Sequence, residues 1–594
     1  MINQILKKGN KEMMKSKLFI FTITIILSVI ILILTLRLWE ADLTIPFSYE
    51  GDGLSVASYF KGVIDNNSVI ENKFIGTPSS LKSVETPMSD WFHIIMIRII
   101  TLIVNEPYVA LNIFYLLTFP LTVITSLMVF FKFKANLFFS MIGSLLYAFI
   151  PYHFMRGENH LFLSAYYIVP IAIMLILEIC DDKELFQKFD KKSNKYKFDL
   201  INLKSLKIFI LGILISSSGV YYSFFTCFFL VVSGIIVGFR KKNMIKWLSS
   251  IIIILIILFG TILNLIPHII YSINNKEVVE SVERSKVESE IYGLKISQLI
   301  LPITGHRIEY IANKKDAYDS EAPLINENGT ASLGIVGSIG FLISLIYVYI
   351  GKKDNLIKDI GLLNLSAILL ASIGGFSTIF AFLVTDMIRS YNRISVFISF
   401  FSIFLIVYIL GEIYNSCCKN IILKRMMLIL GGFILILGIY DETSVRYVPN
   451  YYEIRTQFNA DKKFIEEIEK NAPENTMIFQ LPYIPFPEVA SPYKMGYYDM
   501  LKPYLHSNKL YWSYGSIKGK ENDLWQKEVS SKEPEEFIKN IYDKGFRGIF
   551  IDSYGYENEE TFNKLVEDIL NLTNTIPIYS ENGRYIYIEL DKNI

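Results

Sequence analysis

The sequence has few charged residues and few cysteines for its length. Only 19% of its 594 residues are Asp, Glu, Lys or Arg, whereas 52% are hydrophobic. A soluble protein of this size would carry more charge and fewer unbroken apolar runs. The net charge of +1 gives no general attraction for nucleic acid, so we expect no nucleic-acid partner. The four cysteines do not have the spacing of metal ligands.

The glycine-rich phosphate-binding motifs are also missing. The sequence contains neither GxGxxG nor GxxxxGK[ST], which argues against a soluble nucleotide-sugar or ATP site. The six histidines are scattered, apart from His153 and His160. We therefore expect no cofactor; a divalent metal is compatible with the sequence, but no residue pattern indicates one.

Long apolar runs are what the sequence has instead. Many of them reach the length of about 20 residues that crosses about 30 Å of hydrocarbon. The sequence therefore predicts a polytopic α-helical membrane protein with about eleven transmembrane helices. The predicted spans are 18–38, 108–131, 136–151, 161–179, two short spans within 209–239, 248–271, 332–350, 360–373, 394–410 and 426–440.

The distribution of lysine predicts the orientation. Five lysines precede the first apolar run, which is too long for a signal-peptide core and has no cleavage site after it. By the positive-inside rule the N-terminus is then cytoplasmic, and the lysine-rich short loops agree with this. An odd number of spans places the C-terminus outside. We expect a multi-pass protein of the cytoplasmic membrane.

The composition divides the chain near residue 441. Residues 1–440 form the predicted transmembrane domain, with interfacial helices in an outer loop at 39–107. Residues 441–594 read as an extracytoplasmic α/β domain, because helical segments alternate with short apolar strands. The predicted helices are 464–471, 536–544 and 559–572, and the predicted strands are 476–480, 548–551 and 584–590.

An acidic turn, Ser48-Tyr49-Glu50-Gly51-Asp52-Gly53, follows the first span. The amphipathic run Leu54–Asn66 comes next and predicts a helix that lies in the membrane interface, with a second such helix at 91–104. Asp52 is therefore a candidate catalytic carboxylate at the outer membrane surface. Gly51-Asp52-Gly53 is also an ordinary turn sequence.

Two sets of cationic side chains fall on the predicted outer side. His153, Arg156 and His160 have the spacing i, i+3, i+7 and would share one helix face. Arg389 and Arg393 precede another span. Arginine binds phosphate through its planar guanidinium, so the two sets are candidates for a lipid-linked phosphate. His160 could instead cap a helix, and the last two arginines could be interface anchors.

A single carboxylate suffices for one type of sugar transfer. Asp52 would take the proton from an acceptor hydroxyl as that hydroxyl attacks the sugar carbon. A one-step displacement needs one base, unlike the paired carboxylates of a hydrolase. Glu50 lies beside Asp52 and is a further candidate for substrate binding.

The layout resembles the GT-C superfamily of integral membrane glycosyltransferases. It looks closest to the branch of YfhO-like proteins and of membrane proteins labelled as related to 6-pyruvoyl-tetrahydropterin synthase. The resemblance covers roughly residues 15–440. The matching segments are Glu50-Gly51-Asp52, the loop from Pro151-Tyr152-His153 to His160, Ala331-Ser332-Leu333-Gly334, and Arg389 to Arg393.

The resemblance implies transfer of a sugar from a polyprenyl-phosphate carrier to an acceptor outside the cytoplasmic membrane. The acceptor would be a cell-wall glycan, teichoic acid or protein, and membrane lipid surrounds the enzyme. Asp52 matches the catalytic acid of the family, whereas the acidic pair of the second loop has no clear match beyond Glu158. The alternative is a lipid-linked sugar flippase, for which Ser216–Gly219 is the candidate helix break.

Overall fold

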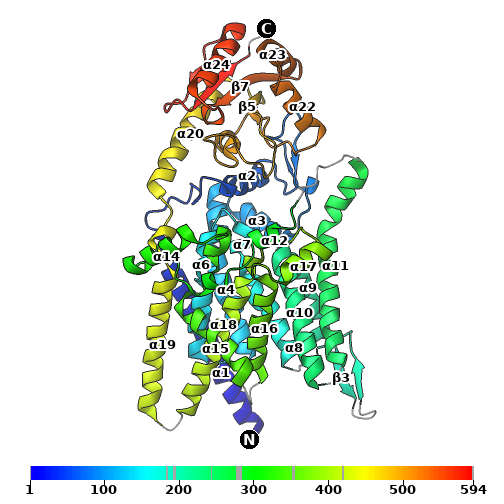
Figure 1. Cartoon of the computed structure of the whole chain (residues 1–594), viewed down its shortest axis with the longest axis vertical. Helices are drawn as coiled ribbons and strands as arrows, with labels where there is room; N and C mark the ends of the chain where they lie inside the picture. Colours follow the sequence, from blue (N-terminus) through cyan, green and yellow to red (C-terminus); the bar gives the residue numbers. More distant parts are fainter. Residues whose placement is uncertain are drawn as a thin grey trace.

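The protein is an elongated helical molecule with a bundle of long helices at one end and a mixed α/β unit at the other (Figure 1). This computed structural model describes residues 2–181, 185–190, 195–241, 244–275, 284–350, 355–417 and 420–590. The chain starts at the far end of the bundle and finishes at the tip of the α/β unit (Figure 1).

The bundle confirms a multi-pass membrane protein. The described residues contain eight helical segments long and apolar enough to span a membrane, or nine if the bent pair α15 and α16 counts as one. The eight are α1 (Ile2–Leu36), α4 (Pro107–Lys132), α5 with α6 (Leu137–Ala148, Pro151–Arg156), α7 with α8 (Leu161–Ser164, Val169–Cys180), α10 (Val220–Lys241), α11 (Met244–Asn275), α18 (Ser395–Ser416) and α19 (Ile421–Glu442).

The remaining predicted spans coincide with shorter helices. These are α9 (Leu203–Ser216), α15 (Gly334–Ile350) and α16 (Asn355–Ala371). The number eleven stays a prediction. The break at Ser216–Gly219 is the turn between α9 and α10, and Phe92 of the outer loop donates its N–H to the Ser217 carbonyl at 3.0 Å. The break therefore lies at the end of the bundle that adjoins the loop of residues 39–107.

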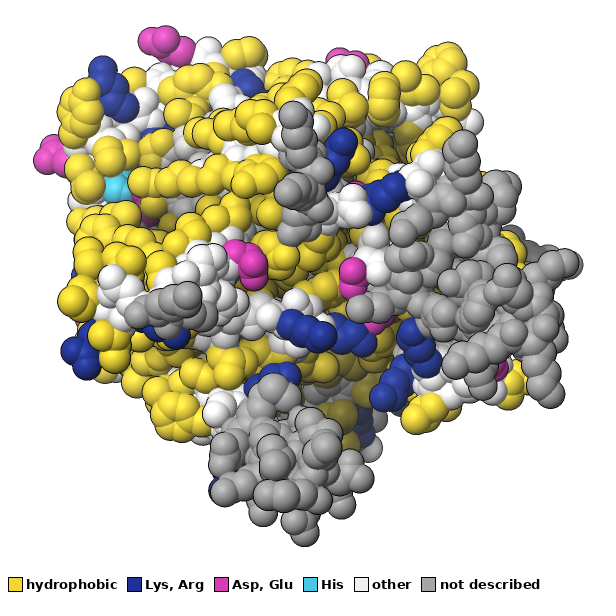
Figure 2. Space-filling model, turned by 90° about the horizontal axis from the view of Figure 1, so that it is seen from below, with side chains coloured by type: hydrophobic (Ala, Val, Ile, Leu, Met, Phe, Trp, Pro, Cys, Tyr) yellow, Lys and Arg dark blue, Asp and Glu magenta, His cyan; other side chains and the backbone are white. Residues whose placement is uncertain are grey.

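Lipid would cover the outside of the bundle. Large apolar side chains on α1 and α19, such as Phe19, Ile429 and Phe433, are more than half exposed, which hydrocarbon tolerates and water does not. Seen from below, the end of the bundle away from the α/β unit shows Lys and Arg side chains among hydrophobic ones (Figure 2).

The C-terminal unit contains a five-stranded sheet in the order β6-β5-β7-β9-β8. β5 pairs in parallel with β6 and β7, while β9 runs antiparallel to β7 and β8. The predicted α/β fold is confirmed. The strands are β5 (Met477–Leu481), β6 (Tyr511–Trp512), β7 (Phe546–Asp552), β8 (Ile578–Tyr579) and β9 (Tyr585–Glu589). The helices are α20 (Tyr451–Asn471), α21 (Lys502–His506), α22 (Glu521–Ser530), α23 (Pro534–Asp543) and α24 (Glu559–Thr573).

Strand periodicity explains how this sheet is covered. Ile549 and Ile551 of β7 point to the face that packs with residues of α23 and α24. Phe550, between them, points to the opposite face, where it joins Phe464 of α20. Both faces are thus buried in protein, as expected for short, apolar strands.

The outer loop contains α2 (Asp52–Asp65), α3 (Trp91–Ile103) and a small hairpin of β1 (Glu71–Asn72) and β2 (Leu81–Lys82). The loop joins the edge of the C-terminal sheet: Trp512 donates its N–H to the Phe74 carbonyl at 2.8 Å. Both parts contribute to one hydrophobic cluster. The domain boundary near residue 441 therefore stays a prediction that packing alone does not mark.

The amphipathic run after the acidic turn is helical, as predicted, but protein covers it on two sides. Phe60 of α2 packs on Phe114 of α4, and Asp65 accepts a hydrogen bond from Tyr504 at 3.0 Å. α2 therefore lies between the bundle and the α/β unit (Figure 1). The expected placement of this helix in the membrane interface stays a prediction, and the C-terminal unit covers one of its sides.

The shorter elements lie mainly in the loops. They are β3 (Gln187–Asp190), β4 (Lys195–Phe198), α12 (Glu288–Ile291), α13 (Ile296–Ile300), α14 (Glu309–Glu321) and α17 (Phe376–Leu383), with the 3₁₀ turns η3 (Asn326–Ala331), η4 (Tyr391–Ile394) and η5 (Val445–Tyr447).

Candidate functional site

Asp52 is the first residue of α2, and its carboxylate faces another candidate residue, His160, which was selected for phosphate binding. Its side chain is 47% exposed, and Oδ2 lies 3.1 Å from Nδ1 of His160. His160 comes from the loop between α6 and α7, more than 100 residues away in the chain. Gly51, just before Asp52, has φ of +54°, a conformation that suits glycine. The fold thus brings together two of the residues selected from the sequence.

The loop that carries His160 also holds the acidic turn in place. Glu158 accepts a hydrogen bond from the Ser48 N–H at 3.0 Å, and Asn159 Oδ1 accepts one from the Gly53 N–H at 3.0 Å. A Cβ on Gly53 would approach Asn159 Oδ1 to 2.7 Å, so this contact requires glycine. The position of Asp52 is therefore set by a second, distant loop.

The α/β unit holds the turn from the other side. The Tyr49 hydroxyl donates to Asp461 of α20 at 2.9 Å and lies 2.7 Å from Nε2 of His506. Tyr49 is 3% exposed. A residue three positions before Asp52 is thus anchored in the C-terminal unit, which makes that unit part of the support of the site.

The two predicted cationic sets meet at one carboxylate. Arg156 donates to Glu327 Oε2 at 2.7 Å, and Arg393 lies 3.5 Å from Oε1 of the same side chain. We call Arg156, Arg393 and Glu327 the arginine cluster. Arg156 also donates to Thr330 and Asn392. Although burial raises the pKa of Glu327, the two arginines outweigh it and lower that pKa to about 2.

The arginine cluster has an excess of positive charge and unused donors. Two guanidinium groups face one carboxylate, and Nε of Arg156 and of Arg393 is buried without a hydrogen-bond acceptor among the described residues. Buried N–H groups are nearly always paired. An anion with several oxygens, such as a phosphate, would satisfy both the charge and the donors.

Arg389 lies beside the cluster but has its own carboxylate. It donates to Glu288 at 2.7 Å, and its guanidinium stands over the ring of Tyr292. Its link to the cluster is Tyr221, whose hydroxyl accepts from the Arg389 N–H at 3.4 Å and whose ring lies 4.3 Å from the Arg393 guanidinium.

His153 lies apart from these groups. Its ring is fully buried and stacks on Phe119 with centroids 3.6 Å apart. Its nitrogens are 2.8 Å from Thr118 Oγ1 and 2.8 Å from the Ala148 carbonyl. These contacts hold α6 against α4, and we do not include His153 in the site proposed below.

A polar cavity of about 620 Å³ adjoins the acidic turn. Glu50, which is exposed, lines it together with Glu158 and Arg156. The other walls come from the bundle and from the start of the C-terminal unit. They include Phe47, Ser48, Tyr115, Phe154, Asn159, Arg446, Tyr447, Asn450, Glu453 and Gln457.

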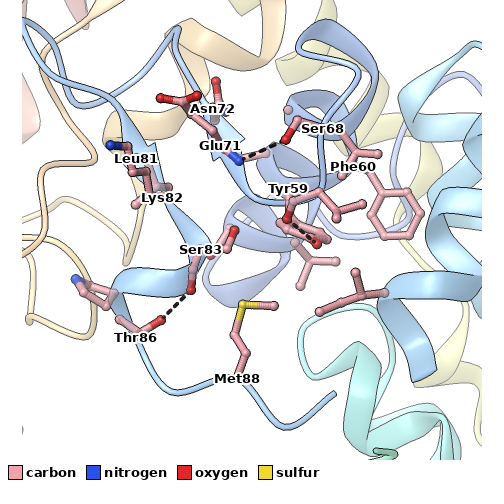
Figure 3. Close-up of a pocket in the computed structure, with 18 of the residues that line it drawn as sticks. Tyr59, Phe60, Ser68, Glu71, Asn72, Leu81, Lys82, Ser83, Thr86 and Met88 are labelled. Carbon is pink, nitrogen blue, oxygen red and sulfur yellow. Dashed lines mark hydrogen bonds between the residues drawn. The ribbon is translucent and has the colours of Figure 1, made fainter. Parts of the chain in front are cut away.

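A second cavity of about 320 Å³ has mainly apolar walls (Figure 3). Tyr59 and Phe60 of α2 face Met88 of the outer loop across it, with Leu81 on the hairpin side. Its polar groups are largely used within the protein; the Tyr59 hydroxyl, for example, donates to the Val69 carbonyl at 3.1 Å. We call the two spaces the polar cavity and the apolar cavity.

Asp52 and His160 line neither cavity, but residues close to them in the sequence line both. Residues 48–50 line the polar cavity, and Ser55 lines the apolar one. In the second loop, Asn159 lines the polar cavity and Phe162 the apolar one. The half-exposed Asp52 carboxylate therefore lies within a few residues of both cavity linings along the chain. Within the described ranges, His, Cys, Asp and Glu side chains form no group of three that would hold a metal ion.

Glu327, Glu158 and Tyr49 are the residues that sequence reasoning missed or left without a role. Glu327 lies in the long loop before a predicted span, where nothing in its neighbourhood marks it. Glu158 was visible only as the single acid of the second loop. Tyr49 is adjacent to Glu50, but its partners are more than 400 residues away.

Comparisons with known proteins identify the fold. No protein-family model and no curated protein sequence matches the chain. Among solved structures, ArnT from Cupriavidus metallidurans bound to undecaprenyl phosphate matches with a TM-score of 0.50 at 9% identity, over 96% of this chain and 98% of ArnT.

The oligosaccharyltransferase of Archaeoglobus fulgidus in the apo form also matches, with a TM-score of 0.46 at 12% identity, over 97% of this chain and 75% of that one. The chain has the fold of ArnT, which confirms the fold part of the predicted GT-C resemblance. The YfhO-like branch stays a prediction.

Proposed function

We propose that the protein is a membrane glycosyltransferase that moves a sugar from a polyprenyl-phosphate carrier to an acceptor on the outer side of the cytoplasmic membrane. The observation that carries this proposal is the position of Asp52. It pairs with His160, and its neighbours in the sequence line a polar and an apolar cavity, on a fold shared with ArnT, whose structure contains undecaprenyl phosphate.

In the proposed reaction Asp52 is the general base. The acceptor hydroxyl oxygen attacks C1 of the donor sugar, and its proton passes to the Asp52 carboxylate. The new oxygen–C1 bond forms as the bond from C1 to the phosphate oxygen breaks, and the phosphate leaves with the electron pair. One displacement at C1 inverts the configuration. His160, at 3.1 Å, orients the carboxylate and takes up part of its charge change.

The arginine cluster is the proposed site of the donor phosphate. Negative charge grows on the leaving phosphate during the reaction, and fixed donors aimed at that charge lower the barrier. Arg156 and Arg393 supply an excess positive charge and free Nε–H groups, with Arg389 nearby. The apolar cavity, next to Ser55, suits the isoprenoid units that follow the phosphate (Figure 3).

The orientation follows from the same proposal. The lysines and arginines at the lower end of the bundle support a cytoplasmic location for that end (Figure 2). The N-terminus is then cytoplasmic, and the α/β unit and Asp52 are extracytoplasmic. Acceptors on this side include cell-wall glycan, teichoic acid and protein.

The test is analysis of envelope glycans from a deletion strain complemented with wild type, Asp52→Asn or Asp42→Asn. Asp42 lies in the same outer loop and accepts hydrogen bonds only from Thr44 among the described residues, which an asparagine oxygen also accepts. We expect wild type and Asp42→Asn to restore a missing sugar. Asp52→Asn should lower transfer by at least a hundredfold, with equal amounts of protein in the membrane.

If the Asp52→Asn variant restored the missing sugar, the assignment of Asp52 as the general base would be overturned. The alternative of a lipid-linked sugar flippase would then be examined in reconstituted vesicles. A flippase would move a labelled lipid-linked sugar across the bilayer at the same rate with and without the Asp52 carboxylate.

A further inference from the structure

The walls of the polar cavity are of the kind that binds carbohydrate. The rings of Phe154 and Tyr447 stack with centroids 5.0 Å apart and mark an aromatic wall. Acidic and amide side chains line the remainder, and these accept and donate hydrogen bonds to hydroxyl groups. They are Glu50, Glu158, Asn159, Asn450, Glu453 and Gln457.

Glu158 has a buried carboxyl with an unused oxygen. Its side chain is 3% exposed; Oε2 accepts the Ser48 N–H, whereas Oε1 has no hydrogen-bond partner in the part of the chain that the structure describes. Burial raises the pKa of this carboxyl to about 8, so it is largely neutral at physiological pH. A neutral carboxyl can donate to one sugar hydroxyl and accept from another.

The charges of the cavity favour an uncharged ligand. Glu50 and Glu453 are exposed carboxylates on its walls. Of the two cations there, Arg156 belongs to the arginine cluster assigned to the donor phosphate, and Arg446 lies 3.5 Å from Asp316. With Arg156 used by the donor phosphate, a polyanionic acceptor such as a phosphate polymer would meet the negative charges of Glu50 and Glu453.

The size and position of the cavity favour the acceptor. A volume of about 620 Å³ lies within the range of roughly 300–1,000 Å³ that holds ligands of several rings. Arg156 of the arginine cluster lines one wall of this cavity, so the donor phosphate would lie at that wall. The wall made by η5 and the start of α20 contains no residue of the arginine cluster and is open to a second sugar substrate.

We infer that the polar cavity is the acceptor site and that the acceptor is an uncharged oligosaccharide. This inference rests on the proposed function, which it narrows to glycan rather than teichoic acid or protein. Gln457 and Glu453 of α20 then contact the acceptor, and Glu158 binds hydroxyls nearest to Asp52.

The first test is binding without catalysis. Full-length protein in nanodiscs is mixed with maltotriose, cellotriose or chitotriose, and saturation-transfer NMR records contact. We expect at least one of the three to bind and the Gln457→Ala variant to bind it about tenfold more weakly. Gln457 is exposed and has no hydrogen bond among the described residues, so its removal leaves the fold intact. Failure of all three sugars to bind, or equal binding by the variant, would overturn the inference.

The second test separates acceptor from donor. Initial rates are measured with the donor and acceptor identified from the envelope, for wild type, Glu453→Gln and Glu467→Gln. Glu467 lies about four turns further along α20, outside the cavity, and carries the same substitution as a control. We expect Glu453→Gln to raise KM for the acceptor several-fold with KM for the donor unchanged.

The outcomes distinguish this inference from the proposed function. A rise in KM for the donor alone would mean that the cavity holds the donor sugar, and the acceptor assignment would fall. Full activity of Asp52→Asn would instead reject the proposed function, whatever the result of the sugar-binding experiment. Teichoic acid or a peptide as the identified acceptor, with Gln457→Ala and Glu453→Gln behaving as wild type, would reject only the inference.

Discussion

Two buried charge networks, the one around Arg584 and the arginine cluster, show how differently this protein uses arginine. In the α/β unit, Arg584 makes two hydrogen bonds to the Asp552 carboxylate, at 2.9 and 2.6 Å, and one to Asp499 at 2.6 Å. Lys502 lies 2.9 Å from the other oxygen of Asp499. Two positive charges therefore face two negative charges, in good geometry and with little exposure.

The cluster at the outer edge of the bundle is unbalanced. Arg156 and Arg393 share the single carboxylate of Glu327, the longer contact is 3.5 Å, and both Nε groups lack acceptors among the residues described. A buried charge network is stable when it is balanced and fully hydrogen-bonded. The network around Arg584 meets this condition by itself, whereas the arginine cluster meets it only with an added anion. This contrast separates a structural network from a binding site.

Replacement of Arg584 by methionine should have the largest effect on stability among the tests of this contrast. It leaves the buried carboxylates of Asp499 and Asp552 without their main partner, which costs about 3–5 kcal/mol of the free energy of unfolding. We expect the α/β unit to unfold at a much lower temperature, measured by tryptophan fluorescence in detergent. Arg455→Met, an exposed arginine on α20, should change stability by less than about 0.5 kcal/mol. Equal stability of the two variants would contradict the structural role.

The same substitution at Arg393 should act on binding instead. A hydrogen bond to a charged group is worth about 1.5–3 kcal/mol, so Arg393→Met should raise KM for the polyprenyl-phosphate donor roughly 10- to 100-fold. Loss of stability should be smaller than for Arg584→Met, because Glu327 keeps its closer partner, Arg156. Kinetics and thermal unfolding of the same preparation check both points. Unchanged KM with strong destabilisation would make this cluster structural as well.

The smallest expected effect is the pH dependence of stability that Glu158 causes. Among the described residues, this buried carboxyl has no arginine partner to hold it in the charged form. Burial raises its pKa from the ordinary 4.5 to about 8, so between these values the folded state holds a proton that the unfolded state releases. This stabilising contribution is complete below about pH 4.5 and disappears as the pH rises through 8.

The unfolding temperature of wild type should therefore fall by a few degrees more than that of Glu158→Gln between about pH 5 and pH 9. Thermal unfolding at several pH values measures this difference. Parallel curves for the two proteins would show that Glu158 ionises normally in the folded state.

Much of the fold follows from local patterns in the sequence. Apolar runs identified the long helices, and the alternation of helix and strand after about residue 441 identified the α/β unit, with boundaries within a few residues at β7 and α24. The amphipathic run after Asp52 was correctly read as a helix. The contact of this helix with the α/β unit was not predicted, because amphipathicity reports that one face is apolar but not whether lipid, water or protein covers the other.

The site was only partly visible in the sequence. Asp52, His160, Arg156 and Arg393 were selected by residue type and position. The structure pairs Asp52 with His160 and brings Arg156 and Arg393 to one carboxylate, that of Glu327. Glu327 was not selected, because its meaning depends on two arginines that are 171 and 66 residues away. His153 has the spacing that would place it on one helix face with Arg156 and His160, but its side chain packs against Phe119.

The amino-acid sequence by itself determined that this chain is a multi-pass helical membrane protein with an α/β unit, since hydrophobic length and periodicity are local properties. Only the tertiary structure decided which charges meet, which donors lack acceptors among the described residues and which residues line the two cavities. Those features depend on contacts between segments hundreds of residues apart, such as Tyr49 with Asp461. The free-energy cost of burying a charge depends on whether such distant partners compensate it, so it cannot be predicted from local sequence.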